Sequence, residues 1–379
     1  VYEQKTGNLF IHHDITLPSL PLCLAHGDIN TEGTTGNYCA VGMFTPGIEL
    51  WNLDILDALE PMCVFGGEDS NNTSKKLKNR PKLAEGSHTD AVMSLSWNAS
   101  HRNLIASGSA DKTVKLWNIT DHKGPPVSTL THHTDKVQSV VWHPLDGTIL
   151  ATGSYDKTAA LVDARCSKGL FKKVKLSADC ESIAWDPFRP ENLTVATEDG
   201  TVVCWDVRKF SDKAGPLWSF VAHEFGGVSD VCYNSHVPGM MATCAIDKTV
   251  ALWDAHSISS EHNIKGPQPC GVKDMAVGKL YSVSFYPSSP WLLGCGGSTG
   301  DLALWDMSQE KTIQSRFGKR VGLSSDIPIE DSSNKPENIN ISSIMNSEKV
   351  DAPAEKARDK TVGKHKNKSS KSKKKVHRR

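Results

Sequence analysis

The sequence lacks a long hydrophobic run: none of its 379 residues lie in a stretch approaching the ~20 apolar residues of a membrane-spanning helix. It also lacks the charged and apolar segments of a signal peptide behind Val1. The ten cysteines include no CxxC pair, and most lie in apolar runs, which is typical of buried free thiols in a reducing compartment. We therefore expect no membrane partner and a location in the nucleus or cytosol.

Signatures of the common enzyme classes are also missing. There is no GxxxxGKS/T loop, no HExxH, no GxSxG, no kinase signature and no Cys/His set with zinc spacing. The nearest metal-like cluster is His12, His13 and Asp14. Adjacent residues of a strand point to opposite faces, so the two imidazoles are not expected to share a site. We expect no enzyme activity, no catalytic residue, no cofactor, no metal and no small-molecule substrate.

Acidic residues are absent from positions 360–379, although the whole chain balances 43 basic against 43 acidic residues. The ten lysines and arginines of this tail leave residues 1–359 with a formal charge of −10. A lysine-rich run indicates a nuclear or nucleolar address or a nucleic-acid-binding segment; the alternative is a merely solvated tail. The residues expected to serve this role are Lys364, Lys366, Lys368, Lys371, Lys373, Lys374, Lys375, Arg378 and Arg379. Residues 321–359 have the low hydrophobicity of a disordered linker.

An internal repeat is the main signal in the rest of the chain. Five segments superpose with the same interval of 20 residues between two mainly aromatic columns, and Trp51 ends a less regular sixth copy. The short, alternating, β-branched pieces and the period of ~40–50 residues fit four-stranded propeller blades. The five pairs are Trp97 and Trp117, Trp142 and Val162, Trp185 and Trp205, Tyr233 and Trp253, and Phe285 and Trp305.

A partial seventh blade is also expected. Residues 7–15 match residues 200–207 in their turn glycine and apolar alternation, with His12 in the position of the tryptophan. Residues 307–317 could add at most one strand. Because a propeller pairs its first and last blades, we expect the missing strands upstream of Val1. The prediction is an all-β, seven-bladed β-propeller over residues 1–320, N-terminally incomplete, with a surface insertion at 66–82.

The repeats resemble the WD-repeat family, whose blades end in Trp-Asp and carry a hydrogen-bonded tetrad of His, Ser/Thr, Asp and Trp. The resemblance implies complete tetrads in two units. We expect these residues to be scaffold rather than catalysts, because an unpaired buried polar group costs about 1–3 kcal/mol. The two sets are His88, Ser107, Asp111 and Trp117, and His223, Thr243, Asp247 and Trp253.

The other units depart from this pattern. One keeps three tetrad residues without the tryptophan, the next keeps the aspartate and the tryptophan without the hydroxyl, and the first and last units have threonine in place of the turn aspartate. The residues concerned are His133, Thr152, Asp156 and Val162; Val195, Asp199 and Trp205; and Thr45 and Thr299.

A closer resemblance rests on LFIHHDITLPSLPLCLA, GNYCAVGMFTPGIELWNLDILDALEP and HTDKVQSV. Over roughly residues 1–320 the chain is similar to the periodic tryptophan protein 1 family. The resemblance implies a non-enzymatic nuclear and nucleolar scaffold in ribosome biogenesis: pre-rRNA processing, large-subunit assembly or association with ribosomal DNA chromatin. Its implied partners are preribosomal proteins, rRNA and chromatin.

A second function remains open. Trp205-Asp206-Val207-Arg208 has the WDxR form that substrate receptors of cullin-RING ubiquitin ligases present to the ligase adaptor, and Val162-Asp163-Ala164-Arg165 is a weaker match. In that case Arg208 contacts the adaptor. The alternative is that Arg208 simply enters a solvent-exposed turn.

Overall fold

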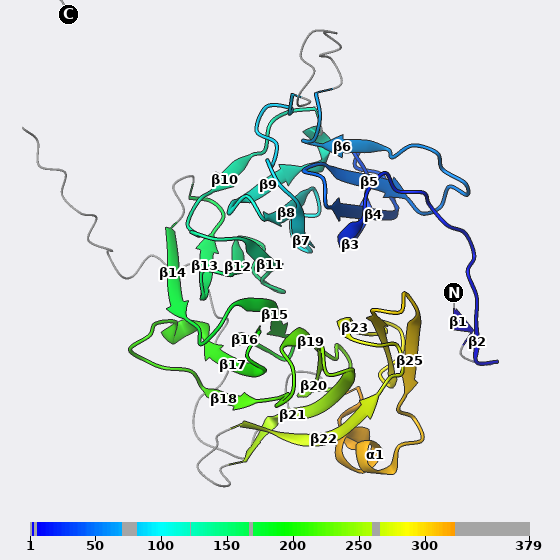
Figure 1. Cartoon of the computed structure of the whole chain (residues 1–379), viewed down its shortest axis with the longest axis vertical. Helices are drawn as coiled ribbons and strands as arrows, with labels where there is room; N and C mark the ends of the chain where they lie inside the picture. The colour runs from blue at the N-terminus through cyan, green and yellow to red at the C-terminus, as the bar shows by residue number, and fades with distance from the viewer. Residues whose placement is uncertain are drawn as a thin grey trace, which may run out of the picture.

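The computed structural model describes residues 2–3, 6–69, 82–121, 123–166, 170–259 and 266–322. Antiparallel sheets follow one another along the chain and stand around a common axis (Figure 1). We number them blade 1 to blade 6. Blade 1 consists of β3 (Pro21–Ile29), β4 (Thr35–Met43), β5 (Ile48–Asn52) and β6 (Cys63–Phe65).

Blades 2 to 5 have four strands each, in sequence order from the first strand outward. Blade 2 contains β7 (Val92–Trp97), β8 (Leu104–Ser109), β9 (Val114–Asn118) and β10 (Ser128–Leu130). Blade 3 contains β11 (Val137–Trp142), β12 (Ile149–Ser154), β13 (Thr158–Asp163) and β14 (Leu170–Lys175). Blade 4 contains β15 (Cys180–Asp186), β16 (Arg189–Thr197), β17 (Thr201–Asp206) and β18 (Trp218–Val221). Blade 5 contains β19 (Val228–Tyr233), β20 (Met240–Ala245), β21 (Thr249–Ser259) and β22 (Gly266–Asp274).

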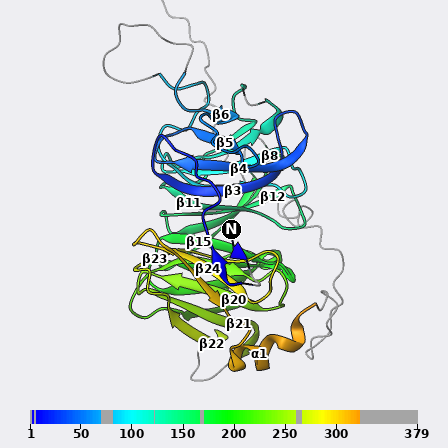
Figure 2. The ribbon, with the colours of Figure 1, turned by 90° about the vertical axis from the view of Figure 1, so that its right-hand side faces the viewer.

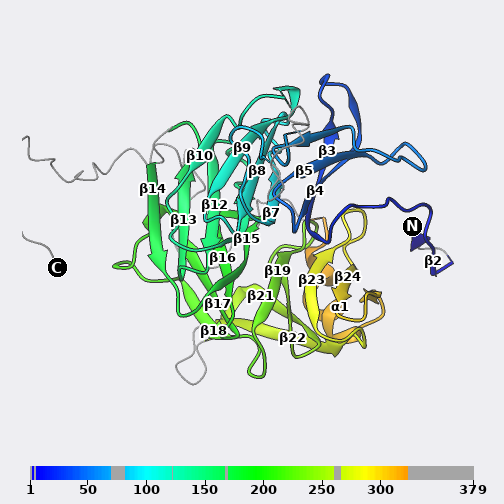
Figure 3. The ribbon, with the colours of Figure 1, turned by 45° about the horizontal axis from the view of Figure 1, so that its top comes forward.

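Blade 6 has three strands among the described residues: β23 (Leu280–Phe285), β24 (Leu292–Gly297) and β25 (Leu302–Asp306). The first strands of successive blades pack side by side, from β3 through to β23 (Figure 3). The chain is therefore an all-β propeller with six blades, and its repeats are the blades. In the part of the chain that the structure describes, no helix has the length and apolarity needed to cross a membrane.

The core lies between successive blades, because the sheets of blades 2 to 5 are each covered by a neighbouring sheet on both faces. Leu116 of blade 2, for example, packs in one buried cluster with Val140 and Trp142 of blade 3. This explains the near-continuous burial of the second and third strands: all six residues of β12 and of β20 are buried. Strands buried on both faces read as continuous apolar runs rather than alternating ones.

Polar side chains join the first strands of successive blades. A first strand is the inner edge of its sheet, and its outward N–H groups would otherwise lack partners. In each of blades 3 to 6, one such group is met by the side chain at an equivalent position of the preceding blade. The main-chain N–H groups of Val140, Ile183, Val231 and Val283 donate to Ser94 Oγ (3.0 Å), Ser139 Oγ (3.2 Å), Ser182 Oγ (3.5 Å) and Asp230 Oδ2 (3.0 Å).

The turn between the second and third strands requires a left-handed residue in five blades. Lys112 (φ 73°), Lys157 (φ 60°) and Lys248 (φ 78°) take this position directly after a turn aspartate, and Gly200 and Gly300 take it in blades 4 and 6. A side chain on Gly200 would also collide with the main-chain oxygen of His223. Non-glycine residues with positive φ are uncommon, and the turn aspartate stabilises them here by accepting main-chain hydrogen bonds.

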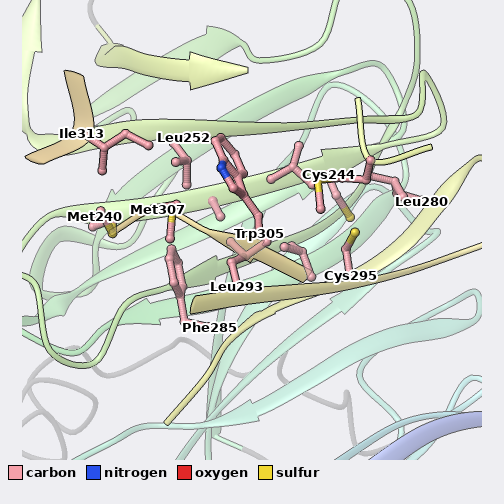
Figure 4. Close-up of a cluster of buried hydrophobic side chains, with 14 of the residues drawn as sticks. Met240, Cys244, Leu252, Leu280, Phe285, Leu293, Cys295, Trp305, Met307 and Ile313 are labelled. Carbon is pink, nitrogen blue, oxygen red and sulfur yellow. The ribbon is translucent and has the colours of Figure 1, made fainter. Parts of the chain in front are cut away.

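The segment after blade 6 is a helix, not the additional strand that residues 307–317 could have formed. Helix α1 (Lys311–Phe317) continues into the 3₁₀ turn η4 (Gly318–Arg320). Ile313 and Phe317 enter the buried cluster between blades 5 and 6, where Figure 4 shows Ile313 next to Leu252 and close to Met307. The pattern of apolar residues four apart is the helical spacing, and it matches the face that the helix buries.

The predicted seventh, partial blade is not formed by residues 7–15. In this region only Asn8–Leu9 (β2) is a strand, and it pairs with β1 (Tyr2–Glu3) in a separate two-stranded sheet beside blade 6 (Figures 1 and 2). His12 is exposed, unlike the buried tryptophans whose position it was expected to share. Apolar alternation alone does not make a strand, because a strand also needs a partner to pair with.

The predicted insertion at 66–82 lies largely outside the described residues. Its two ends meet: Glu68 and Leu83 form a β-bridge, and the main-chain N–H of Asp69 donates to the carbonyl of Lys82 at 2.8 Å. The predicted linker beyond residue 322 and the basic tail 360–379 also lie outside the described residues.

Candidate functional site

In blade 2 the four tetrad residues form one hydrogen-bonded chain. The indole Nε1–H of Trp117 donates to Ser107 Oγ (2.8 Å), Ser107 Oγ lies 2.7 Å from His88 Nε2, and His88 Nδ1 lies 2.9 Å from Asp111 Oδ2. Asp111 also accepts the main-chain N–H groups of Thr89 and Thr113. The chain ties the third strand to the loop that enters the blade.

Blade 5 repeats this arrangement. Trp253 Nε1–H donates to Thr243 Oγ1 (2.9 Å), which lies 2.9 Å from His223 Nε2, and His223 Nδ1 lies 2.9 Å from Asp247 Oδ2. The two sets that the sequence analysis singled out are therefore brought together. Within each chain the hydroxyl and the imidazole are buried and hydrogen-bonded on both sides.

The charges of the tetrads follow from their burial. Burial lowers the pKa of His88 below its usual value, more than the adjacent Asp111 raises it, so His88 is neutral at pH 7. Burial alone would raise the pKa of Asp111, but the hydrogen bonds from His88 and Thr113 lower it well below its usual range. The pKa of Asp247 is also lowered, because hydrogen bonds from Thr249 and His223 outweigh the effect of its burial. Both aspartates are thus ionised.

Blade 3 replaces the missing tryptophan with a second histidine. His133 Nδ1 lies 3.0 Å from Asp156, and both His133 Nε2 and His132 Nε2 lie 2.9 Å from Thr152 Oγ1. Asp156 requires a proton on His133 Nδ1, so the hydroxyl donates to His133 Nε2 and accepts from His132 Nε2–H. His132 therefore takes over the donor role of the indole that Val162 cannot supply.

Two tryptophans have an unpaired donor instead. The Nε1 atoms of Trp205 in blade 4 and Trp305 in blade 6 are buried and without a hydrogen-bond partner. Ten residues before each of them, where Ser107 and Thr243 carry the accepting hydroxyl, stand Val195 and Cys295. In blade 1 the equivalent residue is also apolar, but Trp51 donates to Glu49 Oε2 at 3.0 Å, so its donor is satisfied.

Arg208 folds back onto its own blade. Its Nε donates to Asp206 Oδ1 (2.8 Å) and its Nη2 to Asp206 Oδ2 (2.7 Å), with Glu191 at 3.9 Å. Arg165 of blade 3 is paired with Asp163 in the same bidentate way. The guanidinium is 44% exposed but already bound by a carboxylate, so a contact with a ligase adaptor would have to compete with this pair. This geometry does not favour the ubiquitin-ligase alternative.

An ion-pair cluster on blade 5 escaped the sequence analysis. Asp254, the aspartate of the Trp-Asp pair, is fully buried and accepts hydrogen bonds from Arg316 Nε (2.8 Å) and from both Nη atoms of Arg320 (2.8 and 2.9 Å). In blades 3 and 4 the arginine that pairs with the equivalent aspartate follows it by two residues, as Arg165 and Arg208. In blade 5 the arginines come from helix α1 and turn η4 instead. His256 stands two residues after Asp254, where blades 3 and 4 have an arginine, and its Nε2 lies 2.7 Å from Asp186 Oδ2 of blade 4.

The expectation that His12 and His13 would point to opposite faces of a strand was wrong. Their Nδ1 atoms lie 3.0 Å apart with the rings nearly perpendicular, because residues 10–20 are not a strand and adjacent side chains need not diverge. Among the described residues, no three or more His, Cys, Asp or Glu side chains come together in a group that could hold a metal ion. The tail lysines and arginines that the sequence analysis named lie outside the described residues.

Known protein families match this chain in the same repeats. The family model of the WD domain, G-beta repeat, matches residues 81–118, 124–163 and 214–254. The crystal structure of the mitotic checkpoint complex contains a chain with a similar fold, with a TM-score of 0.58, 17% identity and 80% of each chain covered. At this identity the likeness shows the fold alone.

Three relatives match over most of the chain. An uncharacterised WD repeat-containing protein of Schizosaccharomyces pombe is 40% identical over 85% of this chain. Periodic tryptophan protein 1 of Saccharomyces cerevisiae is 35% identical over 82%, and the periodic tryptophan protein 1 homolog of Drosophila melanogaster is 30% identical over 84%. The chain spans 60%, 56% and 66% of the lengths of these relatives, respectively.

Proposed function

The chain belongs to the periodic tryptophan protein 1 family of WD-repeat proteins, and from this premise we propose that it is a non-enzymatic scaffold in ribosome biogenesis. The proposal places it in the nucleus and nucleolus, bound to preribosomal proteins and rRNA or to ribosomal DNA chromatin. Similarity over 82–84% of the chain to two proteins of this name carries the proposal.

The physical properties of the two parts suit such a role. The propeller holds its polar side chains in structural hydrogen bonds, which is expected of a rigid platform that presents loops and edges to other proteins. The tail adds ten basic residues without an acidic one. Such a segment is attracted to RNA or DNA phosphates without sequence preference, and the attraction weakens with salt by roughly 0.7–0.9 log units per contact and decade of salt.

The test separates the tail from the propeller. Lys371, Lys373, Lys374 and Lys375 are replaced together by glutamine in one full-length variant and by arginine in a matched control. The glutamine variant should lose most RNA affinity, measured by fluorescence anisotropy at several salt concentrations, and its nucleolar enrichment. The arginine control should keep both, because it keeps the charge. Full RNA affinity and nucleolar position of the glutamine variant would contradict the tail's role.

Association with preribosomes is tested on its own. The full-length protein should co-sediment with preribosomal particles, and its depletion should lead to accumulation of unprocessed pre-rRNA. Normal rRNA levels and free sedimentation of the protein would refute the scaffold proposal, whatever the tail binds.

A further inference from the structure

The loop between β5 and β6 of blade 1 exposes several large apolar side chains. It comprises residues 53–62 and projects from the side of the propeller (Figure 1). Four of its side chains are between 38% and 93% exposed, with Leu59 the most exposed: Ile55, Leu56, Leu59 and Met62. Single exposed apolar residues are common on protein surfaces, whereas several gathered in one segment mark an interaction site.

The way the loop packs on its own blade shows that this exposure is not forced by the fold. Ala58, in the middle of the loop, packs against the buried cluster of Val41, Met43 and Trp51. The next residue, Leu59, has the larger apolar side chain and lies almost entirely in solvent. A loop that only covered blade 1 would bury the larger side chain, because burying apolar surface stabilises the folded state.

The equivalent loops of blades 2 and 4 turn their large apolar residues inward. Ile119 follows β9 and is fully buried, and Val207 and Phe210 follow β17 and are also buried. These side chains belong to the apolar clusters between neighbouring blades. A blade can therefore bury the large apolar residues of this loop. Their exposure in blade 1 indicates that another molecule covers them.

The charges of blade 1 indicate the chemistry of that molecule. The loop contains Asp54, Asp57 and Glu60, all exposed, and residues 6–74 contain no lysine or arginine. Asp54 accepts the main-chain N–H of Asn37 at 3.2 Å. Within the described part of the chain, the side chains of Asp57 and Glu60 have neither a hydrogen-bond partner nor an ion-pair partner. Complementary charge steers and selects partners, so basic groups are favoured beside this loop.

We propose that the loop binds a basic segment of a partner protein that also carries large apolar side chains. The apolar side chains of the segment pack on Ile55 and Leu59, and its cations lie beside Asp57 and Glu60. The chain's own basic tail does not suit this surface, because residues 360–379 contain two valines but no larger apolar residue. The inference concerns the propeller body and depends neither on the tail nor on the nucleolar role.

The experiment uses the full-length chain and three fluorescein-labelled ten-residue peptides. In these peptides lysine alternates with leucine, glutamate alternates with leucine, or lysine alternates with serine. Anisotropy titration should show saturable binding of the lysine–leucine peptide. The other two should bind at least tenfold more weakly, because the first lacks the positive charge and the second lacks the apolar side chains. Preference for the glutamate–leucine peptide, or equal affinity for the two lysine peptides, would overturn the proposal.

Two variants of the loop separate the apolar contribution from the charge. Leu59→Ser should weaken binding of the lysine–leucine peptide at least fivefold. Because the side chain is exposed, thermal unfolding of this variant should be unchanged. Asp57→Asn combined with Glu60→Gln keeps the shape of both side chains and removes their charge. This double variant should weaken binding at least threefold at low salt, and its affinity should depend less on salt.

Leu145→Ser is the matched control. Leu145 is 72% exposed in the turn between β11 and β12 of blade 3, so the same substitution is made at an exposed leucine of another blade. It should leave the affinity unchanged. Equal affinity of the Leu59 and Leu145 variants, or absence of saturable binding, would overturn the proposal. So would self-association of the wild-type chain in analytical ultracentrifugation that Leu59→Ser abolishes, because the loop would then bind a second copy.

Discussion

Blades 2 and 4 have the same order of strands but satisfy their tryptophans differently. Trp117 donates into a chain of three polar side chains, whereas the indole nitrogen of Trp205 is buried without a partner. Both tryptophans are almost completely buried. The comparison shows that apolar burial between neighbouring sheets is sufficient to form a blade. The tetrad adds hydrogen-bond partners for buried polar groups, and its loss in blade 4 leaves the buried indole N–H of Trp205 without one.

The largest effect is expected where the tetrad is complete. Asp111→Ala or Asp247→Ala should lower the free energy of unfolding by about 1–3 kcal/mol, because each leaves a buried histidine and main-chain N–H groups without an acceptor. Thr299→Ala in blade 6 is the control and should cost less, since its hydroxyl makes only long contacts. Urea denaturation measures all three. Equal midpoints would contradict the structural role of the tetrads.

Acid should destabilise blade 3, where a second histidine takes the place of the tryptophan. Burial, followed by the charge of His133, lowers the pKa of His132 from 6.5 to about 3. Between these two pH values His132 is protonated in the unfolded chain but neutral in the folded chain. The contribution of neutral His132 to the free energy of unfolding is fully present above pH 6.5 and is lost as the pH falls towards 3. Between pH 7 and pH 5 this one group should cost about 1–2 kcal/mol. His132→Phe should flatten the decline in stability measured by chemical denaturation; an unchanged slope would refute the assignment.

The substitute donor in blade 3 can be tested directly. His132→Ala should destabilise by about 1 kcal/mol, because Thr152 loses its donor. Combining it with Val162→Trp should recover part of this loss, since an indole then reaches the same hydroxyl, as in blades 2 and 5. Thermal unfolding followed by circular dichroism compares the variants. A double variant no more stable than His132→Ala would show that His132 does not replace the indole.

The smallest expected effect is a gain. Val195→Thr should stabilise blade 4 by up to ~1 kcal/mol, because the new hydroxyl accepts from Trp205 and can donate to the carbonyl of Val203 on the paired strand. Cys295→Ser offers the same rescue to Trp305 in blade 6. Ala196→Ser, one residue away in the same strand, is a control that should not stabilise. A loss of stability in Val195→Thr equal to that control would contradict the unpaired-donor interpretation.

The repeat, the strand-rich blades and the residues of the two complete tetrads could all be read from the sequence. The reason is that each blade is one local unit, so a constant interval between aromatic columns reports the same hairpins again and again. The residue that stands ten positions before each tryptophan likewise predicts whether its indole finds a hydroxyl, because the two lie on paired neighbouring strands.

Contacts between distant segments were decided only by the tertiary structure. Nothing local indicates that His132 replaces a lost tryptophan, that Arg316 and Arg320 reach Asp254, or that His256 meets Asp186 of the preceding blade. The assignment of residues 7–15 to a seventh blade and the separation of His12 from His13 were mispredicted for the same reason. Strand periodicity is a local property, whereas pairing partners and buried ion pairs depend on which segments the folded chain brings within a few ångströms of each other.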